Sequence, residues 1–102
     1  MRTNLISDII IQKGSIVSKI LLKNNGGTVT LFAFDEKQSL SKHSTPFDAL
    51  FQCVEGKFNI MIDNDVHSLV KDDLILLPAN IPHSVVAEEA AKCLLVMIKV
   101  NK

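Results

Sequence analysis

His43-Ser-Thr-Pro-Phe-Asp-Ala-Leu-Phe-Gln-Cys-Val-Glu-Gly56 is the stretch of this sequence on which the fold prediction depends. Apolar residues dominate it after the proline, which is typical of a β-strand. Pro46 cannot donate a ladder hydrogen bond, so it belongs at the start of that strand or in a bulge. Glu55 and Gly56 predict the turn that closes the strand. A second segment, Pro78-Ala-Asn-Ile-Pro-His83, combines a strand end, a proline-bounded turn and another histidine.

Short apolar or β-branched runs lie on both sides of these segments. Asn24-Asn-Gly-Gly27 predicts a hairpin, because Asn and Gly tolerate the positive φ that tight strand turns require. Turn signals recur about every 8–12 residues, and no long helical pattern or internal repeat interrupts them. The sequence therefore predicts a single all-β sandwich or barrel over residues 1–102. Its strands are expected at residues 16–23, 28–34, 48–54, 57–63, 66–70, 74–77, 83–87 and 94–100.

Three segments are harder to assign. Residues 3–12 carry apolar side chains at helical spacing, which predicts a short amphipathic turn or helix across an opening, or else an edge strand. Residues 35–42 are polar and read as a loop that delivers His43. Residues 74–77 are all apolar, which indicates a strand buried on both faces, and residues 88–92 read as a charged loop or half a helical turn.

Composition limits the classes of partner. The chain has 11 basic and 11 acidic residues, so no net charge draws it to nucleic acid or to anionic lipid. No run approaches the roughly 20 apolar residues that span a bilayer, and the first residues do not resemble a signal peptide. Cys53 and Cys93 both lie in strand-like runs, and a reduced, cytoplasmic protein is the default expectation.

Hydrophobic content is high for so short a chain, at 47% with a mean hydropathy of +0.26. This is more apolar surface than one small barrel can hide, particularly in residues 94–100 and the N-terminal segment. We therefore expect a homodimer.

The two quoted segments resemble the two motifs of the cupin superfamily, usually written G-x5-H-x-H-x3,4-E-x6-G and G-x5-P-x-G-x2-H-x3-N. The resemblance covers about residues 28–100, with the first motif at about 43–56 and the second at about 72–87. Residues 46–49, 77–83 and 94–98 also resemble small stand-alone bacterial cupins described as conserved-barrel proteins. The resemblance implies an RmlC-like jelly-roll β-barrel, in which paired histidines usually hold a metal.

Only part of the family ligand set is present. His43 fits the first histidine and His83 fits the last. Thr45 stands in the second histidine slot and Ala49 in the glutamate slot. In the second motif Pro78 fits the proline, while Asp72, Asn80 and Ala87 replace the leading glycine, the inner glycine and the final asparagine.

A divalent metal needs about three side-chain ligands to hold it against water. Asp48 is the nearest residue that could complete a two-histidine, one-carboxylate set with His43 and His83, around zinc, iron, manganese or nickel. Strand alternation turns Asp48 to the opposite face unless a bulge at Pro46 reverses it. The alternative is a pair of buried, hydrogen-bonded histidines with no metal. His67 is expected at the surface.

The empty ligand slots favour an organic ligand or an unusual metal site. Thr45 and Ala49 are small, so the pocket should be roomier and less charged than in a four-ligand cupin. Phe51 and Cys53 share the inward-facing alternation of Ala49, and Cys53 is expected to be a buried, inert thiol. The sequence therefore predicts a small cupin that binds a small molecule in its cavity and has a degenerate metal site. The alternative is a metal-dependent enzyme of dioxygenase or isomerase type that uses His43 and His83 with Asp48 or water.

Overall fold

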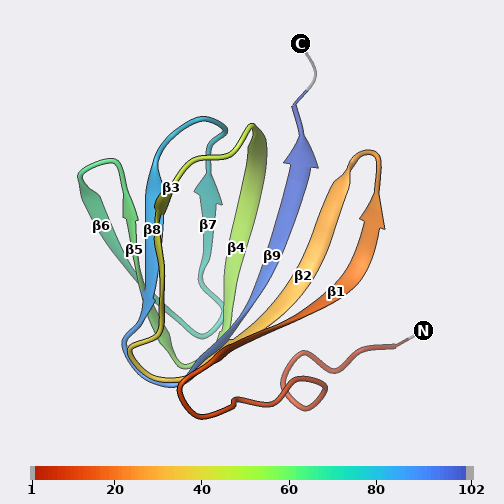
Figure 1. Ribbon diagram of the computed structural model, residues 1–102, viewed down its shortest axis with the longest axis vertical. Coiled ribbons are helices and arrows are strands. Elements are labelled where there is room, and N and C mark those ends of the chain that lie inside the picture. The colour runs from red at the N-terminus through yellow and green to blue at the C-terminus, as the bar shows by residue number, and fades with distance from the viewer. Residues whose placement is uncertain (1, 101–102) are drawn as a thin grey trace.

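The computed structural model describes residues 2–100 and contains two antiparallel β-sheets that face each other (Figure 1). The five-stranded sheet has the order β1-β2-β9-β4-β7, and the four-stranded sheet has the order β3-β8-β5-β6. The strands are β1 (Ile16–Asn24), β2 (Gly27–Phe34), β3 (Ser39–His43), β4 (Phe47–Glu55), β5 (Lys57–Ile62), β6 (Asp65–Val70), β7 (Leu74–Leu77), β8 (His83–Ala87) and β9 (Ala91–Lys99). This is an all-β jelly-roll sandwich, as the sequence predicts.

Alternating side chains on β4 show how the sequence sets the two faces of the larger sheet. Ala49, Phe51 and Cys53 point inward and are at most 5% exposed, whereas Leu50 and Gln52 between them face outward and are partly exposed. This is the period of two that a half-buried strand requires. The inward residues of both sheets form one core.

An aromatic stack joins the two sheets at the centre of this core. Phe58 on β5 meets Phe34 and Phe51 edge to face, with ring centroids 5.1 and 5.0 Å apart. Edge-to-face contacts place the positive ring edge against the negative ring face, which adds to the gain from burial.

Two turns depend on glycine. β1 and β2 form the predicted hairpin, with Asn24 opposite Gly27 and a two-residue loop between them. Gly56 has φ +80° between β4 and β5, and a Cβ atom there would collide with the backbone oxygen of Ala90. Another residue at position 56 would therefore strain the turn and clash with the neighbouring chain.

The N-terminal segment forms a turn at residues 5–8, which is one of the three alternatives that the sequence suggested, and it forms neither the helix nor the edge strand. Residues 2–15 contain only turns and irregular backbone. The side chain of Asn4 accepts hydrogen bonds from the amides of Ile6 and Ser7, which closes one turn and does not extend into a helix. Ile9 packs on Leu31 and Ala33, so the segment covers part of the outer face of the five-stranded sheet.

Three other expectations were wrong in detail. Residues 39–43 form β3 and not a loop, because their backbone pairs with β8 despite their polar side chains. Strand β9 begins at Ala91, earlier than expected. β7 is an edge strand with one exposed face, since Leu74 and Leu76 are 57% and 52% exposed.

No helix among residues 2–100 is long and apolar enough to cross a membrane.

Replacing Phe58 with alanine should destabilise the protein by about 3–5 kcal/mol, because the change removes a fully buried ring and leaves a cavity between the sheets. Urea unfolding followed by circular dichroism measures this loss. Val66→Ala is the matched control, because Val66 lies on the neighbouring strand β6 and is 62% exposed. It should change stability by less than about 0.5 kcal/mol. Equal losses for the two variants would contradict a core centred on Phe58.

Candidate functional site

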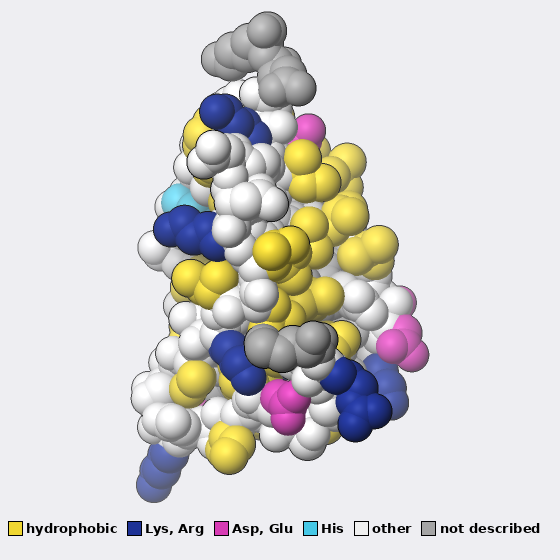
Figure 2. All heavy atoms as spheres, turned by 90° about the vertical axis from the view of Figure 1, so that its right-hand side faces the viewer, with side chains coloured by type: hydrophobic (Ala, Val, Ile, Leu, Met, Phe, Trp, Pro, Cys, Tyr) yellow, Lys and Arg dark blue, Asp and Glu magenta, His cyan; other side chains and the backbone are white. Residues whose placement is uncertain are grey.

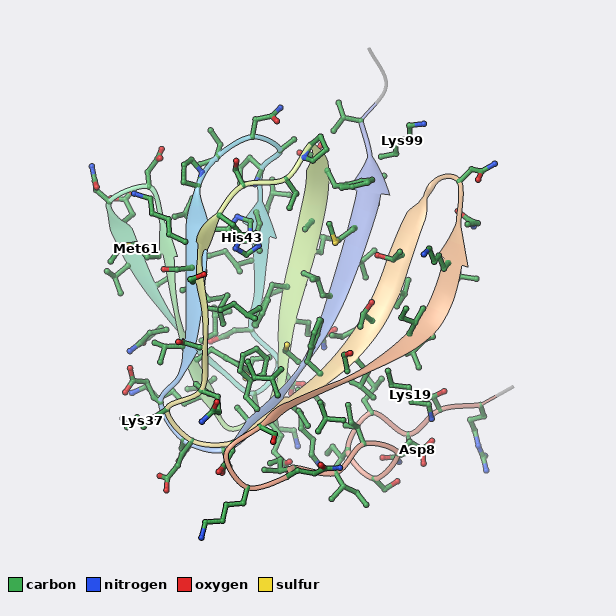
Figure 3. All side chains as sticks on the ribbon, in the orientation of Figure 1. Asp8, Lys19, Lys37, His43, Met61 and Lys99 are labelled. Atoms are coloured by element: carbon green, nitrogen blue, oxygen red, sulfur yellow. The ribbon has the colours of Figure 1, made fainter. Side chains whose placement is uncertain are left out.

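Two histidines meet where β3 ends and β8 begins. His43 and His83 are register partners across this strand pair. Their ring centroids lie 4.5 Å apart and their planes are inclined by 63°. Figure 3 shows the His43 side chain directed from β3 into the space between the sheets. The fold therefore brings two imidazoles that are 40 residues apart in the sequence into direct contact.

Backbone carbonyls hold both imidazoles in one orientation. Nδ1 of His43 lies 2.7 Å from the carbonyl oxygen of Ser41, and Nδ1 of His83 lies 3.3 Å from that of Ile81. A carbonyl oxygen can only accept, so each Nδ1 carries the proton and donates it. In the neutral rings Nε2 is then left with a lone pair.

The two histidines differ in exposure. His83 is 8% exposed, whereas His43 is exposed to solvent, so His43 lies at the mouth of the site and His83 lies deeper. Burial lowers the pKa of His83 below its ordinary value of 6.5. The backbone hydrogen bond to Ile81 opposes this shift, and the neighbouring His43 adds to it.

The histidines line one end of a cavity of about 50 Å³ between the sheets. Its wall is almost entirely apolar, and among residues 2–100 no Asp, Glu, Lys or Arg side chain contributes to it. Besides the histidines, Thr45 is the one polar side chain that the described residues place in the wall, and its hydroxyl interacts with the backbone of Phe47. The remaining lining residues are Phe32, Phe34, Leu40, Ala49, Phe51, Leu77, Val85, Cys93, Leu95 and Met97.

The structure gathers most of the predicted ligand-binding residues at this cavity. Thr45, Ala49 and Phe51 line it together with the two histidines. Cys53 points inward but lies outside the lining, with its Sγ 3.5 Å from the carbonyl oxygen of Gly56. Burial raises the pKa of the Cys53 thiol to about 11, which keeps it protonated and unreactive.

Asp48 does not lie in the cavity. It is exposed on the opposite face of β4, and its carboxylate accepts a hydrogen bond from the amide of Ala79 at 2.9 Å. β4 pairs with β9 in continuous register from Phe47 through Ala49, so the bulge at Pro46 that could have turned Asp48 inward is not formed. His67 is also exposed, on β6.

Sequence reasoning missed the cavity residues contributed by β2 and β9. Phe32, Phe34, Cys93, Leu95 and Met97 alternate along these strands, and alternation identifies them as one face. It does not say which face is inward, because the other face of both strands is equally apolar. Only the position of the second sheet resolves this.

The donor set does not fit a permanently held metal. Within residues 2–100 no group of three or more His, Cys, Asp or Glu side chains is placed to hold an ion. His43 and His83 supply two nitrogen donors, one fewer than the usual minimum.

A β-sandwich with paired histidines at the mouth of an internal cavity defines a cupin-type barrel. The family model for the cupin domain matches residues 30–99, and the chain belongs to this family. No curated protein matches the chain.

Several solved structures share the fold. A conserved protein of unknown function from Streptococcus pyogenes is 29% identical, with a TM-score of 0.93, over 100% of this chain and 90% of that one. A cupin superfamily protein from Desulfitobacterium hafniense is 22% identical, with a TM-score of 0.91, over 97% of this chain and 92% of that one. A cupin 2 conserved barrel domain protein from Leptotrichia buccalis is 36% identical, with a TM-score of 0.87, over 90% of this chain and 45% of that one.

The lowered pKa of His83 predicts a pH-dependent stability. The unfolded chain takes up this proton more readily than the folded protein, so the free energy of unfolding should fall as the pH drops below about 6.5. His83→Phe should make the dependence between pH 7.5 and pH 5.5 shallower, whereas His67→Phe on the exposed strand β6 should leave it unchanged. Urea unfolding at several pH values measures both slopes. An unchanged slope in His83→Phe would contradict the assignment.

Proposed function

We propose that this protein binds a small organic molecule in the cavity between its sheets, with His43 and His83 as the polar contacts. The supporting observation is the lining itself, which combines an apolar wall with two oriented imidazoles at one end. Ligand pockets commonly have this composition, because apolar walls provide affinity and a few fixed polar groups provide orientation. The missing metal ligands favour binding over metal chemistry.

Filling the cavity should abolish ligand binding. Ala49→Val adds two methyl groups to the lining, whereas Gln52→Val places the same side chain on the outer face of β4. Small-molecule fragments can be screened by ¹H–¹⁵N NMR spectra of the wild-type protein. Fragments that shift the amides of Phe51 and Val85 should lose this effect in Ala49→Val and keep it in Gln52→Val. A library that leaves these amides unmoved in the wild type would contradict the proposal.

The second candidate is a metal-dependent enzyme, and one observation favours it. Metal-binding histidines usually donate their other ring nitrogen to a carbonyl or carboxylate, as both histidines do here. Their free Nε2 atoms are the groups that would hold zinc, iron, manganese or nickel. Water would have to supply every other ligand, since Asp48 lies on the opposite face.

Elemental analysis of protein purified without a histidine tag separates the two candidates. With two nitrogen donors we expect clearly less than one metal ion per chain, and Asp48→Asn should not change that content. A stoichiometric metal that is lost in His83→Ala would reverse the order of the two candidates and place the enzyme first.

We also propose that the protein forms a homodimer through the outer face of the five-stranded sheet. Five aliphatic residues form one cross-strand row over all its strands, in the order Leu22, Val29, Val96, Leu50 and Leu76. Leu22 and Leu76 at its ends are 58% and 52% exposed. Figure 2 shows hydrophobic side chains gathered along one side of the face that it presents.

The N-terminal segment covers the neighbouring part of the same sheet, over Leu31 and Ala33, and leaves the row uncovered. A second copy would present the same row, and such self-complementary pairing is the usual geometry of a two-fold dimer. The occupant of this face is therefore proposed to be a second copy of the chain.

Light scattering should give twice the chain mass of 11.3 kDa at micromolar concentration. Leu76→Lys should convert the protein to a monomer without unfolding it, because the new charge lies at the edge of the proposed interface. Val66→Lys puts the same change on an exposed residue of the other sheet and should leave a dimer. A monomeric wild-type protein would refute the proposal.

A further inference from the structure

We infer that the cavity takes a small, uncharged ligand that donates a hydrogen bond, such as an alcohol, to the Nε2 atom of His83, the deeper of the two histidines. This inference rests on the proposed binding function and specifies the chemical class of its ligand. It depends on three properties of the lining: its lack of charge, the direction of its hydrogen bonds and its size.

The lack of charge excludes ionic ligands. Among residues 2–100 no Asp, Glu, Lys or Arg side chain lines the cavity, and the wall is apolar apart from the two histidines and Thr45. While both imidazoles are neutral, a carboxylate, phosphate or ammonium group would lose its water on entry and meet no opposite charge. Such desolvation is among the largest penalties in protein chemistry, so an uncharged head group is strongly favoured.

The direction of the hydrogen bonds decides what that head group must be. Both Nδ1–H groups are used by the carbonyl oxygens of Ser41 and Ile81. The hydroxyl of Thr45 already donates to the carbonyl oxygen of Phe47. The cavity therefore offers lone pairs on two imidazoles and lacks a strong free donor among its lining side chains. A ligand that can only accept hydrogen bonds finds no partner there.

The deeper of the two acceptors is reachable. Nε2 of His83 makes no hydrogen bond within the described chain, although the residue as a whole is only 8% exposed. No fully enclosed side-chain nitrogen or oxygen in residues 2–100 lacks a partner, so this Nε2 has accessible surface, and His83 lines the cavity. An accessible, unpaired acceptor on a residue that lines an apolar cavity is a site for a matching donor.

Size limits the part of the ligand that can be buried. The cavity holds about 50 Å³, whereas an engineered apolar cavity that binds benzene holds about 150 Å³. The buried part of the ligand is therefore smaller than a benzene ring. The rings of Phe32, Phe34 and Phe51 and the surrounding aliphatic side chains favour hydrocarbon for all but the head.

Four probes of nearly equal size test the inference. These are 1-butanol, its isomer diethyl ether, butyrate and n-butylammonium, each titrated into the wild-type protein at pH 8.0 and followed by ¹H–¹⁵N NMR. This pH lies above the ordinary titration range of histidine. We expect 1-butanol to shift the amides of Phe51 and Val85 and to bind at least about fivefold more tightly than diethyl ether, the gain of one hydrogen bond. The two ions should not shift these amides.

A variant assigns the effect to the histidine. His83→Phe removes the deeper acceptor and keeps an aromatic ring, so 1-butanol should bind no better than diethyl ether. Equal binding of the two isomers to the wild type would overturn the donor requirement while leaving cavity binding intact. Preferred binding of butyrate or n-butylammonium would overturn the uncharged class, again without affecting the proposed function. If none of the four probes moves the cavity amides, this inference fails, and the fragment screen with Ala49→Val then decides the proposed function separately.

Discussion

The contact of Phe58 with Phe34 and Phe51 is the interaction on which the rest of the structure depends. These rings come from both sheets and pack edge to face in the core between them. Phe34 and Phe51 also form part of the cavity wall, whereas Phe58 lies outside it. The stack therefore does two things at once. It holds the sheets together and sets the limit of the cavity, while smaller residues such as Ala49 leave the space beyond it open.

The histidine pair depends on this arrangement but obeys a different constraint. β3 and β8 bring His43 and His83 into register, and carbonyl groups two residues before each histidine set its tautomer. Because these bonds use the Nδ1 protons, the chemical character of the site is that of an acceptor. In a four-ligand cupin the neighbouring slots would supply further donors to a metal. Here Thr45 and Ala49 supply a hydroxyl bound to the backbone and a methyl group, and this difference is the basis of our proposal that the ligand is an organic molecule.

The outer face of the five-stranded sheet has two parts, of which the N-terminal segment covers one. Ile9 packs the N-terminal segment onto Leu31 and Ala33 of this face. Two hydrogen bonds also hold the segment in place. Lys92 Nζ donates to the carbonyl oxygen of Ile6, and the amide of Gly14 donates to the Asp35 carboxylate. The aliphatic row from Leu22 to Leu76 crosses the other part. The proposed dimer would account for the excess of apolar residues in so short a chain. β7, for example, is apolar throughout, yet Leu74 and Leu76 on one of its faces are exposed in the single chain.

The sequence by itself determined the all-β class, most of the strands and turns, and the two histidines as the first candidates for a site. Period-two alternation, proline, glycine and the motif spacing are local signals that do not depend on the rest of the chain.

The remaining features of the fold and the site depended on tertiary contacts. Polar residues 39–42 became part of β3 because β8 offered them a backbone to pair with. The N-terminal segment stayed irregular because packing on Leu31 and Ala33 required no regular hydrogen bonding. Cys53 was left out of the cavity and Cys93 brought into it, although the two are register partners on neighbouring strands. Alternation specifies which side chains share a face, but only the placement of the second sheet determines how deep each one lies and whether it meets a cavity, a neighbour or solvent.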